Sequence, residues 1–436
     1  MIPCTCVLQE KLVARRLYNI LFCVLLPGLL ARMWWRGRRA PAYRQRILER
    51  LSLVLPDRRY DIWVHAVSVG ETLAAVPLVR KLLEVHPELS IIVTNMTPTG
   101  AERAQALLGN QVGHHYLPWD VLAAQQRWLA AIHPRLLIVM ETELWPNMLW
   151  AAHLHGVKVV LANARLSQRS AQAYGRWPAL VSPMLSCLDK VAAQERATAE
   201  RFIQLGVPQD RVEMTGSLKF DMPQPALNRT ELRTHWHVEA RVIWVAGSTH
   251  EGEEAFVLEA FRGLLTYYPE ALLMLVPRHP ERFGDVERLL NLQHWRYQRR
   301  SVSEVIAKDT QVWLADSMGE LMQWYAMADI ALVAGSLLPH LGGHNMLEPL
   351  GLGVPTLSGP FVLNFQTIAE ELVAAGALQI TPDVASLTQA CQVILTCPED
   401  AAKGVQAGKA ILSRNRGALQ RHLQIIDELL LAPPVH

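Results

Sequence analysis

The chain has 436 residues, of which 50% are apolar and 19% are charged. This composition excludes a disordered protein and provides enough apolar residues for two or three domains. Residues 1–50 carry a net charge of +8 and the rest of the chain carries −6, so the body lacks the basic surplus of a nucleic-acid-binding protein. The six cysteines are scattered and form no CxxC pair, which argues against a disulfide scaffold or a zinc module.

An uncharged apolar segment, residues 17–31, lies between Arg16 and Arg32. A helix over it spans about 22 Å, less than the roughly 30 Å of a hydrocarbon core, and Pro27 is expected to interrupt it. It could be a cleaved signal peptide, a soluble amphipathic helix, or a signal anchor or monotopic membrane helix. We favour the last interpretation, because no small-residue cleavage site precedes the following arginines, which suit anionic lipid headgroups. The larger number of basic residues after the segment predicts a cytoplasmic body.

From residue 60 onward, short segments rich in Val and Ile alternate with helical stretches such as 72–85 and 98–108. This alternation is typical of a doubly wound α/β fold with parallel sheets. It pauses at residues 221–228, which contain two prolines and no apolar periodicity. The expected strands before the pause are 61–66, 90–94, 113–117, 136–140, 158–161, 190–193 and 212–214. After it they are 241–246, 271–276, 311–315, 329–333 and 354–357.

We therefore expect two Rossmann-like domains, 51–222 and 231–436, that face each other across a cleft and are joined by a linker at 223–230. Residues 1–50 form the membrane anchor and basic segment. A last helical stretch at about 401–431 can pack back on the N-terminal domain. Ligands of such sheets bind at the carboxyl ends of the strands, so the strand-end loops are where the chemistry is expected.

Charged residues follow three strands of the first domain. Glu71 opens a helix after a tight turn, where it either complements the helix dipole or acts as a general base. Glu141 and Glu143 stand two residues apart, so they share a face if the chain stays extended, although one of them could instead cap the next helix. Lys219 lies beside the linker, where it either reaches an anionic group or is a plain surface lysine.

The second domain has glycine-rich or basic strand ends at 246–254, 275–283, 316–321 and 334–349. Arg278 suits a bidentate contact with phosphate. Residues 334–349, AGSLLPHLGGHNMLEP, form a glycine-rich turn that leads into a helix with Asn345 as its expected N-cap, an arrangement typical of a phosphate cradle. Glu348 could accept hydrogen bonds from a ribose diol, or it could only complement the helix dipole.

Several motifs are missing from the sequence. It has no GxxxxGK[ST] phosphate loop, no complete dinucleotide fingerprint, no GxSxG nucleophile elbow and no HExxH zinc motif. It also has no DxD pair, which argues against a divalent metal that bridges a nucleotide sugar.

Taken in order, the motifs HAVSVGE, ETELWPN, NARLSQRS, GSLKFD, AGSTHEGEE, LVPRHPERF, MGEL and GGHNMLEP resemble the 3-deoxy-D-manno-octulosonic acid (Kdo) transferases of Gram-negative bacteria. The resemblance runs from about residue 10 to the C-terminus. It implies a GT-B glycosyltransferase that moves Kdo from CMP-Kdo to lipid IVA in lipopolysaccharide core biosynthesis. It also implies an inverting reaction without metal or cofactor, at the cytoplasmic face of the inner membrane.

The resemblance assigns roles by motif position. Domain 51–222 would take the acceptor and domain 231–436 the CMP-Kdo. Glu71 matches the catalytic base, and Glu141 and Lys219 match residues that stabilise the transition state. The positions that match the CMP-binding stretches are Pro277, Arg278, Met318, Gly319, Glu320, Asn345, Met346, Leu347 and Glu348. Two alternatives stay open: a GT-B transferase with another nucleotide sugar, such as UDP-GlcNAc, and a non-catalytic membrane-anchored lectin or scaffold.

Overall fold

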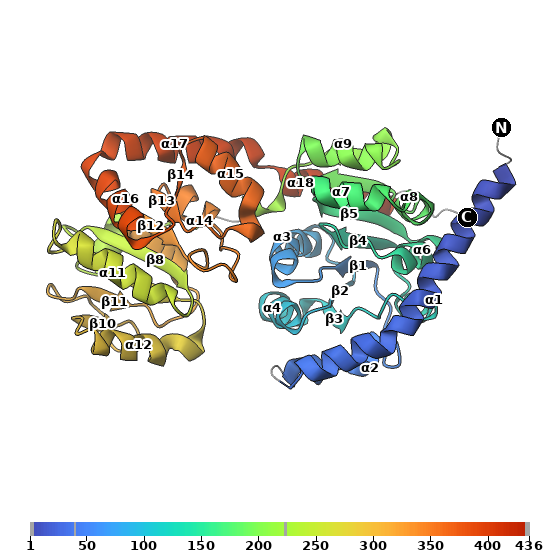
Figure 1. The fold of residues 1–436 in the computed structure, drawn as a ribbon, viewed down its shortest axis with the longest axis horizontal. Coiled ribbons are helices and arrows are strands. Elements are labelled where there is room, and N and C mark those ends of the chain that lie inside the picture. Colours follow the sequence, from blue (N-terminus) through green and yellow to red (C-terminus); the bar gives the residue numbers. More distant parts are fainter. Residues whose placement is uncertain (1–3, 39–40, 222–224, 432–436) are drawn as a thin grey trace. The chain divides into compact units, whose positions relative to one another are not determined.

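The structure is a computed structural model that describes residues 4–38, 41–221 and 225–431, with only the backbone for residues 4–12. The chain divides into two compact units. The N-terminal unit comprises Met1–Met222 and Asn415–His436, and the C-terminal unit comprises Pro223–Arg414. Each unit contains one seven-stranded parallel sheet with helices packed on it (Figure 1).

The sheet of the N-terminal unit has the order β3-β2-β1-β4-β5-β6-β7. The chain direction across the sheet therefore reverses between β1 and β4, and such a reversal marks the ligand-binding crevice of a doubly wound fold. The seven expected strands are confirmed within a few residues. They are β1 (Ile62–His65), β2 (Ile91–Asn95), β3 (Gly113–Tyr116), β4 (Leu136–Met140), β5 (Lys158–Ala164), β6 (Lys190–Ala193) and β7 (Val212–Met214).

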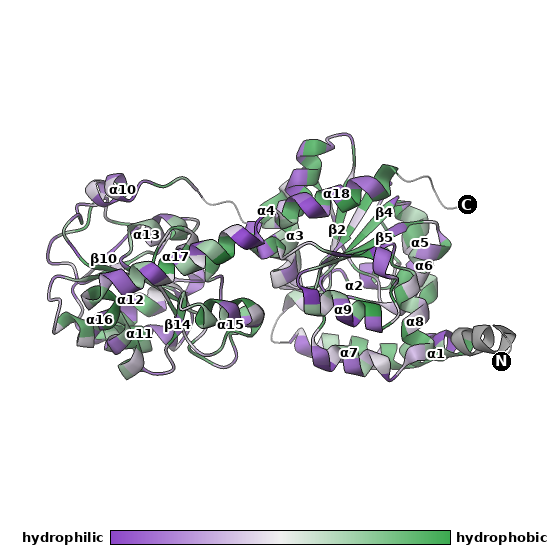
Figure 2. Cartoon of the chain, turned by 90° about the horizontal axis from the view of Figure 1, so that it is seen from above, coloured by the Kyte–Doolittle hydropathy of each residue, from purple (hydrophilic) through white to green (hydrophobic). Residues whose placement is uncertain are grey.

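Helices cover both faces of this sheet, which is why its central strands are apolar throughout (Figure 2). Ile62 and Val64 belong to one apolar cluster, whereas Trp63 between them belongs to the other, as the two-residue period of a strand requires. The covering helices are α3 (Val69–Val85), α4 (Pro98–Leu108), α5 (Leu122–Ile132), α6 (Pro146–Leu154), α7 (Gln168–Gly175), α8 (Pro178–Ser186), α9 (Arg196–Gln204) and α18 (Ala418–Leu431).

The N-terminal helix α1 (Cys4–Arg36) is longer than the apolar segment that predicts it, and it continues through Pro27, so the expected interruption is wrong. It packs beside α8, and its Tyr18 hydroxyl donates to Asp120 at 2.9 Å. Residues Val13–Arg36 are long and apolar enough to cross a membrane. The large apolar side chains that α1 leaves exposed are Val13, Leu17, Ile20, Leu21, Val24, Leu25, Trp34 and Trp35. A four-residue helix, α2 (Ile47–Arg50), follows.

The sheet of the C-terminal unit has the order β10-β11-β9-β8-β12-β13-β14 and reverses between β8 and β12. The five expected strands are confirmed, but the edge strands β10 and β14 are not predicted by the sequence. The strands are β8 (Ile243–Thr249), β9 (Leu272–Pro277), β10 (Tyr297–Arg299), β11 (Val312–Leu314), β12 (Ile330–Val333), β13 (Thr356–Ser358) and β14 (Leu378–Ile380). The helices are α10 (Arg229–His235), α11 (Glu253–Leu265), α12 (Phe283–Leu292), α13 (Leu321–Met327), α14 (Leu347–Gly351), α15 (Gln366–Ala374), α16 (Val384–Thr396) and α17 (Pro398–Asn415).

The expected single helical stretch at 401–431 is two helices, α17 and α18, because the chain breaks at Gly417 with a φ of +86°. The Asp221 carboxylate accepts hydrogen bonds from the backbone N–H groups of Gly417 at 2.8 Å and Leu419 at 2.5 Å. It thereby provides partners for N–H groups at the start of α18 that have none within the helix. Helix α17 belongs to the C-terminal unit, whereas α18 belongs to the N-terminal unit and packs in its core through side chains such as Leu423 and Ile426.

Candidate functional site

Glu71 lies in the first turn of α3, directly after β1. Ser68 is the N-cap of this helix, and its hydroxyl donates to one carboxylate oxygen of Glu71 at 2.8 Å. The Val67 N–H donates to the other oxygen at 2.7 Å, so the side chain is folded back over the strand-end turn. Glu71 is only 8% exposed. The turn thus fixes the carboxylate in one orientation at the carboxyl end of β1.

The pKa of the Glu71 carboxyl is raised from its usual 4.5 to about 8. Burial is the main cause, because a carboxylate loses the water that stabilises its charge, and the Glu143 carboxylate is the second. The hydrogen bonds from Ser68 and Val67 favour the charged form and oppose this rise, while Glu141 adds to it. A carboxyl with a pKa near neutrality is well matched to general-base chemistry.

Glu141 follows β4, the strand that pairs with β1 across the reversal. Its φ of +53° turns the chain, so the expectation of an extended backbone through Glu141 and Glu143 is wrong. The two carboxylates are nevertheless close enough for Glu141 to raise the pKa of Glu143, whose main perturbation is burial. Both also act on Glu71. Three carboxylates therefore gather at the carboxyl ends of β1 and β4.

Lys219 supplies a positive charge to this cluster. Its Nζ lies 3.5 Å from Oε1 of Glu141, and both side chains are 16% exposed. This Glu141 oxygen is buried and has no hydrogen-bond partner among the described residues. The interpretation of Lys219 as a plain surface lysine is therefore wrong.

The alternative that Glu141 or Glu143 caps α6 is also wrong. Asp120, which the sequence analysis did not single out, performs this role: its carboxylate accepts the N–H groups of Asn147 at 3.0 Å and Met148 at 2.8 Å. The glutamates are consequently not needed to satisfy the helix. Burial raises the pKa of Asp120 to about 6.

The segment that carries Lys219 is held in place by residues distant in sequence. Lys219 lies in a short 3₁₀ helix, η4 (Leu218–Asp221), and the Leu218 N–H donates to the Asn163 side-chain oxygen at 3.0 Å. Asn163 has a φ of +51°, and its own N–H donates to Nε2 of His422 on α18 at 2.9 Å. Nδ1 of His422 donates to the Ala418 carbonyl, so the ring is neutral, and burial lowers its pKa to about 4. Sequence analysis quoted Asn163 only within the NARLSQRS motif and missed His422.

In the C-terminal unit the residues expected to bind CMP lie at or after the ends of β9, β11 and β12. Pro277 ends β9, and the Arg278 N–H donates to the Thr249 carbonyl at 2.9 Å. Gly319 has a φ of +87° and Met318 is exposed. The Glu320 carboxylate accepts two hydrogen bonds from Arg300, at 3.2 and 3.0 Å.

Asn345 and Glu348 lie at the start of α14. The Asn345 side-chain oxygen accepts the Leu347 N–H at 3.1 Å, and its amide donates to Glu348 at 3.3 Å. The helix begins at Leu347, with Met346 in the N-cap position, so the predicted cap lies one residue early although Asn345 does satisfy the helix start. Met346 and Leu347 have buried side chains, so a ligand here would meet their backbone.

The glycine-rich loop after β12 is not an open phosphate cradle at its first residues. The N–H groups of Gly335, Ser336 and Leu337 all donate to the carboxylate of Glu253. Farther along, the His344 ring stacks on His250 with an Nε2–Nε2 distance of 2.9 Å. Burial lowers the pKa of His250 to about 4 and of His344 to about 3, so both rings are neutral. The described part of the chain contains no cluster of three metal-ligating side chains.

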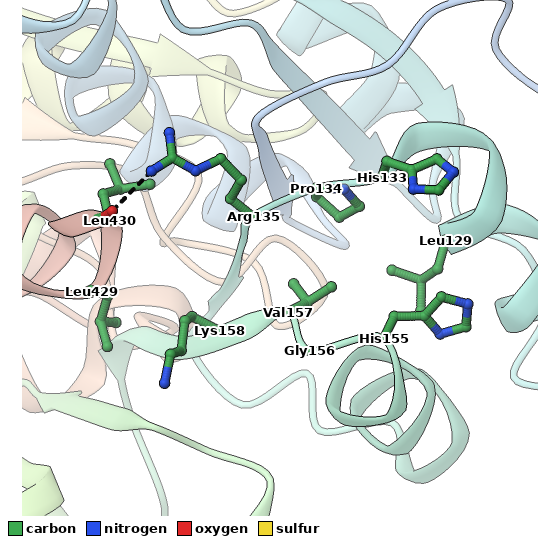
Figure 3. A pocket seen from close by; sticks show the side chains of 10 residues that line it. All are labelled: Leu129, His133, Pro134, Arg135, His155, Gly156, Val157, Lys158, Leu429 and Leu430. Carbon is green, nitrogen blue, oxygen red and sulfur yellow. Dashed lines mark hydrogen bonds between the residues drawn. The ribbon is translucent and has the colours of Figure 1, made fainter. Parts of the chain in front are cut away.

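A cavity of about 340 Å³ lies at the opposite end of the N-terminal sheet (Figure 3). It is lined by the residues that lead into β4 and β5, among them Arg135 and Lys158, and by the end of α18. Its basic side chains have partners: Arg135 donates to the Leu430 carbonyl at 2.9 Å (Figure 3), and Lys158 pairs with Asp189. Because ligands of such sheets bind at the carboxyl ends, this cavity is not the candidate site.

Comparison with known proteins agrees with the resemblance. A family model described as 3-deoxy-D-manno-octulosonic-acid transferase matches residues 43–222. The 3-deoxy-D-manno-octulosonic acid transferase of Haemophilus influenzae is 42% identical over 424 residues, which cover 95% of this chain and 99% of that protein. The Bordetella pertussis enzyme of the same name is 34% identical over 433 residues, with 95% and 99% covered.

Solved structures agree on the fold. A glycosyltransferase from Rickettsia africae superposes with a TM-score of 0.55 at 14% identity, and covers 86% of this chain and 100% of its own. The UDP-bound MnaA of S. aureus has a TM-score of 0.56 at 15% identity, with 86% and 99% covered. The chain therefore belongs to the family of 3-deoxy-D-manno-octulosonic acid transferases, and it is a glycosyltransferase with the GT-B fold.

Proposed function

We propose that this enzyme transfers Kdo from CMP-Kdo to lipid IVA, in an inverting reaction that needs no metal. The observation that carries the proposal is the cluster at the carboxyl ends of β1 and β4. There Glu71, buried and with a pKa of about 8, lies beside the Glu141–Lys219 pair. One group in this cluster can accept a proton near neutral pH, and another can offset negative charge.

In the proposed step Glu71 takes the proton from a glucosamine 6-hydroxyl of the acceptor. The freed oxygen attacks the anomeric carbon of Kdo and forms the new glycosidic bond. The bond from that carbon to the phosphate oxygen breaks on the opposite face, and CMP leaves with the electron pair. The anomeric configuration is therefore inverted.

The charge that develops on the leaving phosphate must be stabilised by fixed donors. We assign this role to Arg278 and to the loop at residues 342–345, except for the Gly343 N–H, which already donates to the Gly335 carbonyl. Lys219 and Glu141 stabilise charge near the acceptor oxygen. Preorganised donors of this kind are worth roughly 10²–10³-fold in rate each. The other residues expected to bind CMP, at 318–320 and 346–348, would hold the nucleotide.

We further propose that α1 anchors the enzyme to the inner membrane, with both units on the cytoplasmic side. The row of exposed apolar side chains on α1 supports this, as do Trp34 and Trp35 at its end. The exposed arginines Arg32, Arg36, Arg38 and Arg44 would contact anionic lipid headgroups, which matches an acceptor that is itself a phosphorylated lipid, whereas Arg50 is buried and has no such role.

The test is an incubation of the purified protein with lipid IVA and either CMP-Kdo or UDP-GlcNAc. We expect CMP release and a product heavier by whole Kdo residues with the first donor, and no product with the second. Excess EDTA should leave the rate unchanged, and NMR of the product should show the inverted anomer. Transfer from UDP-GlcNAc alone, or activity abolished by EDTA and restored by a divalent metal, would contradict the proposal.

A further inference from the structure

Glu253 presents a fully buried carboxylate at the first position of α11. Its Oε1 accepts the N–H groups of Ser336 at 3.0 Å and Leu337 at 2.9 Å. Its Oε2 accepts those of Gly335 at 2.8 Å and His250 at 2.9 Å. Several backbone N–H groups that converge on one point form a cradle of the kind that binds phosphate or carboxylate ligands. Here the chain fills the cradle with its own side chain.

A short chain of contacts connects the cradle to the residues that are expected to bind CMP. The Gly335 carbonyl accepts the Gly343 N–H at 2.6 Å, so fixing Gly335 also fixes the far end of the glycine-rich loop. His344 follows, and its ring stacks on His250, whose N–H is bound by Glu253. Asn345 comes next in the chain. A displacement at Glu253 would therefore move the segment from which Asn345 extends.

We propose that Glu253 is a positioning residue for the sugar nucleotide: a built-in anion that closes the Gly335–Leu337 cradle and holds residues 342–348 in their ligand-binding shape. The inference rests on the proposed donor site at Asn345–Glu348. It also specifies where the donor phosphate does not bind, because the N–H groups of residues 335–337 are already used. Glu253 itself touches no reacting atom.

The variant test uses CMP as the ligand and isothermal titration calorimetry as the readout. Glu253→Gln keeps the size of the side chain but turns an NH₂ group toward two N–H donors, so two of the four hydrogen bonds are lost. Asp329→Asn is the control for the loss of a carboxylate elsewhere on the sheet: Asp329 accepts the Ile243 N–H at 2.8 Å and pairs with Arg229 and Arg233, at the amino end of the same sheet. Asn345→Ala reports on the donor site directly.

We expect Glu253→Gln to weaken CMP binding at least tenfold and Asp329→Asn to leave it within twofold. The KM for CMP-Kdo should rise more in Glu253→Gln than kcat falls, which a general loss of fold would not produce. Wild-type CMP affinity in Glu253→Gln, with binding weakened in Asn345→Ala, would overturn the role of Glu253 alone. Wild-type affinity in Asn345→Ala would contradict the proposed donor site itself.

Amide hydrogen exchange on the unmodified protein tests the same inference without any variant. If Glu253 fills the cradle, the N–H groups of residues 335–337 exchange slowly without CMP, and their rates stay the same when CMP is added. If the cradle instead receives the donor phosphate, these groups exchange quickly in the free enzyme and slow down on CMP binding. The second result would overturn the proposal even if the Glu253→Gln variant could not be purified.

Discussion

The ionisation of Glu71 should govern how the transfer rate depends on pH. With a pKa of about 8, only about a tenth of the Glu71 side chains carry the base form at pH 7, and half carry it at pH 8. The value of kcat/KM should therefore rise about tenfold for each pH unit up to about pH 7 and level off above pH 9.

Two neighbours of Glu71 should shift this profile in opposite directions. Glu143→Gln removes a negative charge that raises the pKa of Glu71, while the new amide oxygen can still accept from Trp145 Nε1, which lies 3.1 Å from the Glu143 carboxylate. The midpoint should fall by roughly one pH unit. Ser68→Ala removes the hydroxyl that donates to the charged carboxylate at 2.8 Å, so the midpoint should rise.

The assay is the initial rate of CMP release between pH 6 and 9.5, at saturating CMP-Kdo and low lipid IVA concentration. Glu71→Gln serves as the control for the base itself. It should lose about 10²–10⁴-fold in rate on the high-pH plateau, and its rate should no longer follow the ionisation of Glu71, while CMP affinity stays near normal. A profile that is flat from pH 6 to 8.5, or an upward shift in Glu143→Gln, would refute the assignment of Glu71.

The remaining predictions concern stability and the partners of the site. Since the pKa of Glu71 is raised from 4.5 in the unfolded chain to about 8, the folded protein binds more protons between these values, and its stability falls as pH rises through this window. Thermal unfolding should show that the stability of Glu71→Gln relative to the wild type increases from pH 5 to pH 9, by at most about 5 kcal/mol. A stability difference that does not change with pH would refute the buried carboxyl. Lys219→Met should lower kcat about 10²–10³-fold without changing CMP affinity, whereas Lys158→Met, at the other end of the sheet, should leave turnover intact. Gly335→Ala would place a Cβ 2.4 Å from the His344 ring at a φ of +70°, so CMP affinity should fall, and wild-type affinity by calorimetry would contradict the loop geometry.

The alternation of apolar and polar segments was sufficient to predict both parallel sheets, because a strand covered by helices on both faces must be apolar along its length. The missed strands β10 and β14 are three residues long and lie at sheet edges, where Tyr297–Arg299 stay half-exposed and carry no apolar run. The order of motifs was likewise sufficient to identify the family. Local patterns of this kind depend only on neighbouring residues, so they can be read from the chain alone.

Other features depend on residues that only the folded chain brings together. His422 fixes Asn163 from 259 positions away, Asp221 caps α18 from about 196, and Glu253 closes a loop 82 to 84 residues later. Nothing in the local sequence marks these pairs, since a buried backbone N–H can donate to any well-placed oxygen or ring nitrogen. Which side chain supplies it is decided by strand order and helix packing. The sequence by itself therefore determined the sheets, the family and the candidate carboxylates, while tertiary structure decided which polar groups hold them in place.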